Sequence, residues 1–551
     1  MTISEKISVL RHKAGWSQDE LAEKLNVSRQ SISKWESGKA LPDSDKLLLL
    51  SELFNVSTDF LLRDTEDYVA VTAPDNLADD NSTADPAPTP ADDTVFYNSF
   101  TTDPTVPDGN TTVQDSTPQK KKKSHTKKII AAVIATVLVI ALIIPIPTGL
   151  YEKWFCEEYV EYPYVLVHGL GGYGTESKIN EVNPYWGAET GNVATYLRDE
   201  MGYKVYEASV GPFSSTWDRT CELYAQLTGT TVDYGEAHSK AHNHDRYGRT
   251  YTEKLAPEWG EETKGGQVVK LNLVGHSFGG ATIRLLTSLL EYGCEEEVTI
   301  SGDNVSALFK GGQGNLVNSV TTLCSPHNGS TLYYCVEQYN VVDYALDFVF
   351  YGSKLVQENT IGDYYDFHLE HFGIDTESQD ASTILKTVFS QGTDNAAYDL
   401  SPDGAAEINK NIKTVDNVYY FSYAYSMTEE KWGKHIPSLG SINILTLPST
   451  LIGSYSENKV TDYPIDETWL ENDGMVNVIS AKYPFNDKWQ EYDSENIVKG
   501  KWNVMPIRKG HHGTVVGMDN TVEETRQFYL DLFTMIDEQP RDKKYYFKGL
   551  F

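Results

Sequence analysis

The chain has 551 residues, more than one hydrophobic core usually organises, so two or more domains are expected. Hydrophobic residues make up 40% of it and aromatic residues 12%, which excludes a chain that is disordered throughout and a collagen-like fibre. A formal net charge of −33 excludes general binding to nucleic acids or anionic membranes unless basic residues are concentrated locally, and five cysteines are too few for a disulfide scaffold.

Residues 1–66 are predicted to form a small all-α domain. Ser17, followed three positions later by Glu20, predicts the start of a helix. Ser28 predicts the start of a second helix over residues 29–37, which Gly38 ends. Two short helices joined by a tight turn predict a helix-turn-helix.

Over residues 3–62 this domain resembles the Cro and phage-repressor family of DNA-binding domains. The resemblance lies in Ser17-Gln18-x-x-Leu21-Ala22 and in Val27-Ser28-Arg29-Gln30-x-Ile32-x-Lys34-Trp35-Glu36-x-Gly38. It implies that the second helix lies in the major groove of DNA. The expected base contacts come from Arg29, Gln30, Ser31 and Ser33, and the expected phosphate contacts from Gln18 and Lys34. Residues 1–66 hold nine basic and eleven acidic residues, and this negative balance favours the alternative of a helical protein-interaction module.

Residues 67–128 are predicted to be a disordered linker. Residues 67–119 contain ten acidic residues, no Lys or Arg, and much Pro, Thr and Ala, so they cannot bury enough apolar surface to offset the entropy of ordering. Six lysines then follow at 120–123, 127 and 128.

Residues 129–149 are predicted to be a transmembrane helix, because 129–144 contain a single polar residue, Thr136. A buried core helix and a cleaved signal peptide are the alternatives. The lysines before the span predict a single-pass protein of the cell membrane, with a cytoplasmic N-terminus and residues 150–551 outside the cell.

Residues 150–551 alternate short β-branched runs, such as 164–167, 268–274 and 320–323, with helical stretches, which predicts an α/β domain with a mostly parallel sheet. The apolar run Leu271–Val274 leads directly into Gly275-His276-Ser277-Phe278-Gly279 and then into a helical stretch. A strand, a G-x-S-x-G turn and a helix in this order predict a strained turn that presents Ser277 as a nucleophile.

The other parts of a serine hydrolase site follow from chain order. The N–H of Phe278 and the N–H of Leu170, in the glycine-rich loop after residues 164–167, are the expected oxyanion donors. In this fold the acid and the histidine come after the serine, and Asp473 and His512 satisfy that order. His511 is the less favoured alternative to His512.

Residues 162–535 resemble the large secreted triacylglycerol lipases of staphylococci and thermophilic bacilli. The motifs include Val210-Gly211-Pro212-Phe213-Ser214-Ser215-x-Trp217-Asp218-Arg219, Val232-Asp233-Tyr234-Gly235, Ser325-Pro326-His327 and Leu470-Glu471-Asn472-Asp473-Gly474. The resemblance implies an α/β-hydrolase with a lid and zinc-bound insertions, and a catalytic triad of Ser277, Asp473 and His512.

The resemblance also implies metals. A structural zinc is expected on Asp218, His238, His244 and Asp399, and the imidazole-rich run 237–244 suits zinc independently. The resemblance also implies a calcium ion on Asp519 and the Gly440 carbonyl, although Thr514 and Asn520 stand where the family has Glu and Pro, and the loss of a carboxylate weakens a calcium site. The aromatic insertion between Ser325 and Asp399 is expected to act as a lid over the acyl pocket, with ordinary cap packing as the alternative.

The expected function is therefore a membrane-anchored lipase that hydrolyses acylglycerol esters, fused to a cytoplasmic DNA-binding domain. Two alternatives stay open: a carboxylesterase for shorter or non-lipid esters, and a membrane-tethered transcription regulator whose hydrolase-like domain senses a ligand. The sequence leaves the oligomeric state open, a dimer through the membrane span included, as well as the coupling between the domains.

Overall fold

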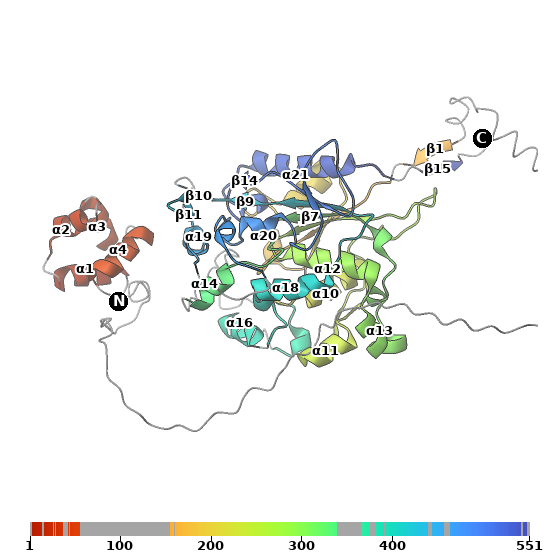
Figure 1. Cartoon of the computed structure of the whole chain (residues 1–551), viewed down its shortest axis with the longest axis horizontal. Helices are drawn as coiled ribbons and strands as arrows, with labels where there is room; N and C mark the ends of the chain where they lie inside the picture. The colour runs from red at the N-terminus through yellow and green to blue at the C-terminus, as the bar shows by residue number, and fades with distance from the viewer. Residues whose placement is uncertain are drawn as a thin grey trace, which may run out of the picture. The chain divides into compact units, whose positions relative to one another are not determined.

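The computed structural model describes most of residues 3–54 and 155–547. The exceptions are 14–15, 26, 28, 37–41, 43, 159, 339–364, 375–380, 391, 439–442, 457–462 and 542–543. The chain divides into two units, Met1–Ser99 and Phe100–Phe551, and each is described by itself (Figure 1). The predicted linker and the predicted span at 129–149 lie outside the described residues. Within the described part, no helix combines the length and apolar character that crossing a membrane requires.

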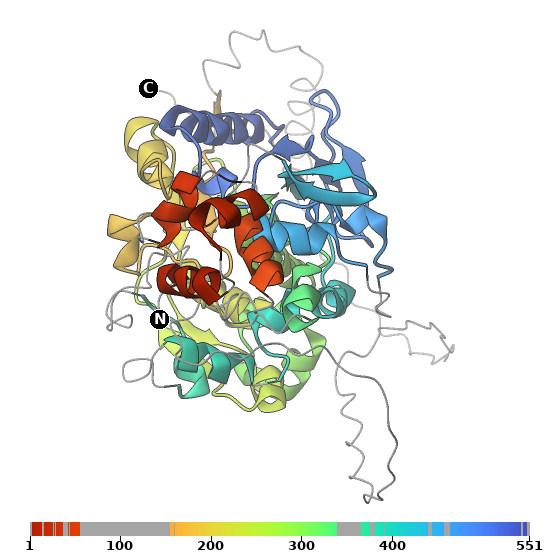
Figure 2. The same ribbon diagram turned by 90° about the vertical axis from the view of Figure 1, so that its left-hand side faces the viewer.

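The described part of the N-terminal unit contains four short helices, drawn in red in Figure 2: α1 (Ile3–Lys13), α2 (Gln18–Lys24), α3 (Arg29–Glu36) and α4 (Ser44–Phe54). Helices α2 and α3 begin where the capping residues predict. The core draws on all four helices and contains Ile7, Leu10, Leu21, Ala22, Leu25, Ile32, Trp35 and Leu50. The apolar side of α3 is thereby buried.

The C-terminal unit is built on a seven-stranded sheet in the order β12-β13-β8-β7-β6-β2-β3, and every neighbouring pair is parallel. This confirms the predicted α/β fold with a parallel sheet. The strands are β2 (Tyr164–Val167), β3 (Val205–Ala208), β6 (Leu271–His276), β7 (Val317–Leu323), β8 (Tyr419–Tyr423), β12 (Trp489–Glu491) and β13 (Trp502–Val504). Strands β2, β6 and β7 are buried along their whole length, as expected of strands covered on both faces.

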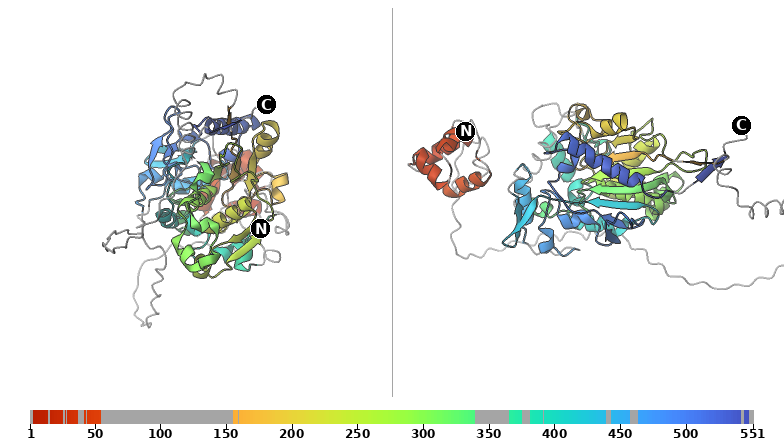
Figure 3. Two further views of the ribbon diagram at one scale, coloured as in Figure 1. Left: turned by 90° about the vertical axis from the view of Figure 1, so that its right-hand side faces the viewer. Right: turned by 90° about the horizontal axis from the view of Figure 1, so that it is seen from above.

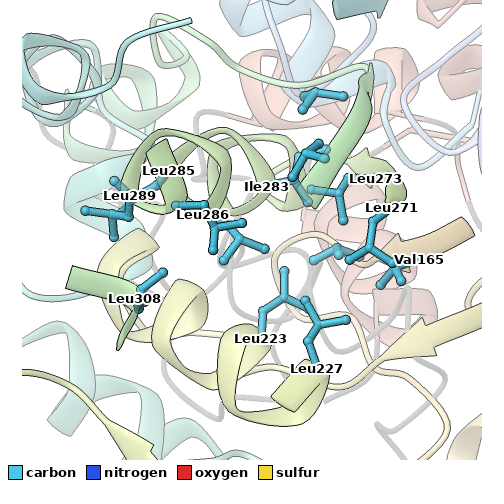
Figure 4. Packing of buried hydrophobic residues seen from close by; sticks show 14 of the residues in the cluster. Val165, Leu223, Leu227, Leu271, Leu273, Ile283, Leu285, Leu286, Leu289 and Leu308 are labelled. Atoms are coloured by element: carbon cyan, nitrogen blue, oxygen red, sulfur yellow. The ribbon is translucent and has the colours of Figure 1, made fainter. Parts of the chain in front are cut away.

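Helices cover both faces of the sheet. Helices α10 (Thr216–Thr228) and α12 (Gly279–Tyr292) pack on one face, where Leu223 and Leu286 meet Val165 and Leu273 (Figure 4). Helix α21 (Val522–Asp537) covers the other face and crosses the strands when seen from above (Figure 3). The sheet is thus the middle layer of three.

Smaller elements surround this framework. The short strand pairs are β1 (Phe155–Glu158) with β15 (Lys544–Phe547), β4 (Thr231–Asp233) with β5 (Tyr247–Thr250), β9 (Tyr425–Ser426) with β14 (Arg508–Lys509), and β10 (Thr428–Lys431) with β11 (Lys434–Pro437). The remaining α-helices are α8 (Ile179–Val182), α9 (Val193–Thr195), α11 (Glu236–His242), α13 (Glu295–Ser301), α14 (Leu332–Gln338), α16 (Ala381–Phe389), α17 (Ala396–Asp399), α18 (Pro402–Asn411), α19 (Thr446–Gly453) and α20 (Val478–Lys482).

Candidate active site and metal site

Ser277 stands in a strained turn between β6 and α12. Its φ of 54° lies in the left-handed region, which costs a non-glycine residue roughly 1–2 kcal/mol. The two glycines of the motif are required by space, since a Cβ on Gly279 would lie 2.1 Å from the Val167 oxygen and a Cβ on Gly275 would lie 2.6 Å from the Gly279 carbonyl carbon. The Ser277 N–H donates to the Leu323 carbonyl at 2.8 Å. The turn therefore holds Ser277 at the carboxyl end of the central strands.

Asp473 and His512 form a buried pair. The distance from His512 Nδ1 to Asp473 Oδ2 is 2.8 Å, and the His512 N–H donates to the Asp473 carbonyl, also at 2.8 Å. Asp473 Oδ1 accepts the N–H groups of Met475 at 2.9 Å and Val476 at 2.7 Å. One carboxylate oxygen is therefore held by the backbone, and the other orients the imidazole.

His276 connects this pair to the Ser277 turn. Its ring lies 4.9 Å from the His512 ring between centroids, and its Nε2 lies 3.0 Å from the His512 carbonyl. Because a carbonyl only accepts, that Nε2 carries a hydrogen, and the Tyr185 hydroxyl lies 2.6 Å from the other ring nitrogen. Burial, and next the neighbouring His512, lower the pKa of His276 well below its ordinary value, so this ring is neutral.

His511 has a different partner from His512. Its Nε2 lies 3.0 Å from Asp519 Oδ2, and its Nδ1 accepts the Gly513 N–H at 3.1 Å. Of the two histidines, only His512 pairs with Asp473 in the described part of the chain.

The loop after β2 approaches the serine closely. A Cβ on Gly169 would lie 2.6 Å from the Cβ of Ser277. The next residue is Leu170, and among the described residues neither its N–H nor that of Phe278 donates to a partner. Two free backbone donors near a nucleophile are what an oxyanion requires.

Arg219 braces this loop, a role that the sequence analysis did not identify. Its fully buried guanidinium donates to the His168 carbonyl at 2.5 Å, the Gly211 carbonyl at 2.7 Å and the Thr282 hydroxyl at 3.0 Å. It also lies 4.9 Å from the Phe278 ring centroid. One side chain thus connects the loop after β2 to the helix that follows Ser277.

A second cluster brings together Asp218, His238, His244 and Asp394, whose ligand atoms all lie within 4.8 Å of one another. His238 Nε2 lies 3.2 Å from Asp218 Oδ1 and 3.4 Å from Asp394 Oδ1. His244 Nε2 lies 3.4 Å from Asp394 Oδ2, and neither of these two buried atoms has a hydrogen-bond partner among the described residues. His244 Nδ1 faces the Asp245 carbonyl at 2.9 Å, which places the hydrogen there and leaves Nε2 free to bind a metal.

The electrostatics of the cluster also fit a cation. Burial alone would lower the pKa of His238, but Asp394 and Asp218 raise it to about 10. Two carboxylates and two imidazoles match the donors that zinc binds.

The predicted ligand set needs one correction, because the residue at the cluster is Asp394 and not Asp399. Asp399 ends α17, and its Oδ2 accepts the Thr216 N–H at 2.6 Å. The Asp399 carboxylate therefore accepts a hydrogen bond from the first turn of α10. Burial raises the pKa of this carboxyl to about 7. His371 is a further neighbour of the cluster, with Nε2 3.1 Å from Asp218 Oδ2.

The structure leaves the expected calcium site untested, because only one of its two predicted ligands, Asp519, is among the described residues. Gly440 lies outside them. Asp519 Oδ2 is 3.0 Å from His511 Nε2 and 3.2 Å from Asn443 Nδ2, and the Asp519 N–H donates to Glu189 Oε2 at 3.1 Å. The calcium site stays a prediction. Residues 339–364 of the expected lid also lie outside the described residues.

In the N-terminal unit, Arg29 and Lys34 are exposed on α3 and Ser31 is half-buried. The side chains of Gln30 and Ser33 lie outside the described part. The Gln18 amide, expected at a phosphate, donates to Glu36 Oε2 at 2.7 Å, and Glu36 also pairs with Arg11 at 2.6 Å. Gln18 is therefore held within the domain, an arrangement that the sequence analysis missed.

Comparisons with known proteins match both units. Residues 160–540 match the family model described as lipase-like, C-terminal domain, and residues 7–61 match the model described as helix-turn-helix. The chain is 35% identical over 384 residues to a Staphylococcus epidermidis protein named lipase, and the match covers 67% of this chain and 52% of that protein. The chain therefore spans about half the length of the curated relatives that it matches.

Two solved structures resemble the C-terminal unit. EstA from Clostridium botulinum is 34% identical with a TM-score of 0.62, and the match covers 70% of this chain and 88% of EstA. Lipase 1 from Pelosinus fermentans is 36% identical with a TM-score of 0.60, and the match covers 70% of this chain and all of that chain.

Proposed function

Because the chain belongs to the family of lipase-like C-terminal domains, and also carries a helix-turn-helix domain, we propose that residues 150–551 hydrolyse carboxylic esters of lipids at Ser277. The observation that carries this proposal is the 2.8 Å contact between Asp473 and His512 beside the strained Ser277 turn. A buried imidazole oriented by a carboxylate is what a serine hydroxyl needs to become a nucleophile.

In this mechanism His512 removes the hydroxyl proton of Ser277 as the oxygen attacks the ester carbonyl. Asp473 holds the imidazole with its Nδ1–H toward the carboxylate, which leaves Nε2 as the base, and it stabilises the imidazolium that forms. The N–H groups of Leu170 and Phe278 bind the oxyanion. His512 then protonates the leaving alcohol, and it later removes a proton from the water that releases the acid from Ser277.

A lipid substrate, with acylglycerols the first candidates, is favoured by the apolar surroundings of the loop after β2. Leu170 packs against a cluster that contains Tyr173, Phe213, Tyr365 and Phe367. Apolar walls next to an oxyanion site suit an acyl chain. Hydrolysis of esters of increasing chain length separates this proposal from the alternative of a carboxylesterase, for which the rate should peak on short esters.

The direct test is Ser277→Ala in the full chain. Hydrolysis is expected to fall by about 10⁶-fold while the fold persists, because the hydroxyl is the reacting group. Ser494→Ala, at an exposed loop position, is the matched control and should leave the rate unchanged. If the rate survives Ser277→Ala, the proposed mechanism is wrong. The ligand-sensor alternative predicts instead that regulation through the N-terminal unit survives Ser277→Ala.

We further propose that zinc binds Asp218, His238, His244 and Asp394 in a structural role. The ion would supply a cross-link between α10, α11 and the loop before α17, and it would leave the ester chemistry to Ser277. Metal analysis of the purified protein tests this, and a stoichiometry below one zinc per chain after dialysis against micromolar zinc would contradict it.

For the N-terminal unit we propose DNA binding through the exposed side of α3, supported by the helix-turn-helix match and by exposed Arg29 and Lys34. The apolar run 129–144 and the lysines before it support an anchored protein with this unit in the cytoplasm and the ester hydrolase outside. Selection of binding sites from random DNA duplexes, repeated with Arg29→Ala, tests the proposed DNA binding. Protease accessibility in intact cells tests the proposed membrane topology.

A further inference from the structure

Three different ligand atoms meet at the Asp473–His512 pair. The sulfur of Cys324, a carboxylate oxygen of Asp473 and a nitrogen of His512 all lie within 4.8 Å of one another. Cys324 directly follows β7, is fully buried, and has a φ of 52°. Its N–H donates to the Tyr423 carbonyl at 2.8 Å, so its place beside the Asp473–His512 pair is fixed by the sheet.

We propose that this cluster is an inhibitory site for a thiophilic divalent cation, of which zinc and cadmium are the representatives. The inference rests on the proposed ester hydrolysis, because the site lies between two of its residues. It is separate from the cluster at Asp218, which contains no sulfur.

The chemistry of the three donors selects the cation. A thiolate, an imidazole and a carboxylate suit zinc and its softer relatives, whereas magnesium and calcium prefer oxygen ligands alone. The thiol has to lose its proton before sulfur binds a metal, so a cation that forms a strong bond to sulfur is favoured at this site.

Binding at this site would disable the imidazole. A metal–sulfur bond forms, and the thiol proton leaves to solvent. The Nδ1 proton of His512 moves to Nε2, so that the ring stays neutral and Nδ1 binds the metal. The Asp473–His512 hydrogen bond is replaced by two metal bonds, and Nε2, now protonated, can no longer accept the Ser277 proton.

The two clusters give zinc opposite effects at different concentrations. The cluster at Asp218 has two carboxylates and two imidazoles in place, so it should fill first and stabilise the fold. The cluster at Cys324 has to lose a proton and a 2.8 Å hydrogen bond before it binds, so it should fill only at higher concentration. Hydrolysis is then expected to rise and later fall as zinc increases.

The experiment uses the full chain, first saturated with zinc at the tighter site. Cadmium is then added while ester hydrolysis and the ultraviolet charge-transfer absorption of a cadmium–sulfur bond are followed together. The parent protein should lose at least ten-fold in rate, and the absorption should grow with the same midpoint. Cys324→Ala and Cys324→Gly, each compared with its own rate before cadmium is added, should lose no rate on addition of cadmium and should show no such absorption. Gly also tolerates the left-handed backbone.

Cys294→Ala is the matched control, because this cysteine is only partly buried and lies outside the cluster. It should respond to cadmium as the parent does. Inhibition that persists in both Cys324 variants, or a parent protein without the cadmium–sulfur absorption, would overturn the proposal. If the parent protein hydrolyses no ester at all, the proposed function fails, while the Cys324-dependent absorption still decides whether the cation binds.

Discussion

Replacing Asp394 by Asn is expected to remove most of the zinc-dependent stability of the C-terminal unit. The Asp394 carboxylate lies 3.4 Å from a nitrogen of each of two imidazoles, and Asn keeps its shape but removes its charge. Losing this ligand should weaken zinc binding by about 100-fold or more, since even residues behind the ligands are worth about 10- to 100-fold. At free zinc 100 times the parent dissociation constant, binding stabilises the fold by about 2.7 kcal/mol, and a site weakened 100-fold retains about 0.4 kcal/mol.

The assay is urea denaturation with and without buffered zinc, and Asp399→Asn is the matched control. The side-chain amide oxygen that this substitution introduces can still accept the Thr216 N–H, so the variant should keep nearly all of the zinc-dependent stabilisation. The assignment of ligands would be refuted if Asp399→Asn lost that stabilisation while Asp394→Asn kept it.

Three further outcomes are expected. Asp473→Asn should lower kcat by about 10⁴-fold with little change in KM, measured by steady-state kinetics on a soluble ester; a loss confined to KM would contradict its role. Gly279→Ala should destabilise the fold in urea far more than Gly260→Ala. A Cβ at Gly279 would lie 2.1 Å from the Val167 oxygen, whereas a Cβ at Gly260 meets no atom within 4 Å. The Gly260 substitution should cost only the backbone strain of its φ of +79°, roughly 1–2 kcal/mol. Burial raises the pKa of the Glu207 carboxyl above its ordinary 4.5. As pH rises, the carboxyl therefore loses its proton in the unfolded chain before it does so in the folded protein, and the folded protein loses stability as pH rises above 4.5. Glu207→Gln should remove this loss, and its advantage in urea should grow from about pH 4 to about pH 7; an advantage independent of pH would argue against the shift.

The sequence alone was sufficient to predict those parts of the structure that a local pattern of residues determines. The turn around Ser277 could be predicted because a strand, two glycines and a helix follow one another within a few residues, and the structure places Ser277 in a left-handed turn there. The helices of the N-terminal unit could be predicted from their capping residues for the same reason. The parallel sheet followed from the alternation of β-branched runs with helical stretches.

The residue roles that the sequence predicted wrongly or did not predict depend on contacts between segments that are far apart in the chain. Asp394 and Asp399 lie five positions apart and are the same residue type, so only the packing of α10 against α17 decides which one faces the two imidazoles. Arg219 lies in a motif that the sequence did reveal, but its role depends on the His168 carbonyl, 51 positions away. Cys324 gave no signal, because a buried cysteine is ordinary until its neighbours are known.

Asp218 and Arg219 are consecutive residues on the first turn of α10. Asp218 belongs to the cluster proposed to hold zinc. Arg219 donates a hydrogen bond to the His168 carbonyl, beside the glycine-rich loop. Because adjacent positions of a helix move together, a shift of Asp218 caused by loss of the proposed zinc is expected to reach the His168 peptide through Arg219. The proposed zinc would then affect the turnover of the proposed hydrolysis without contacting the acyl chain.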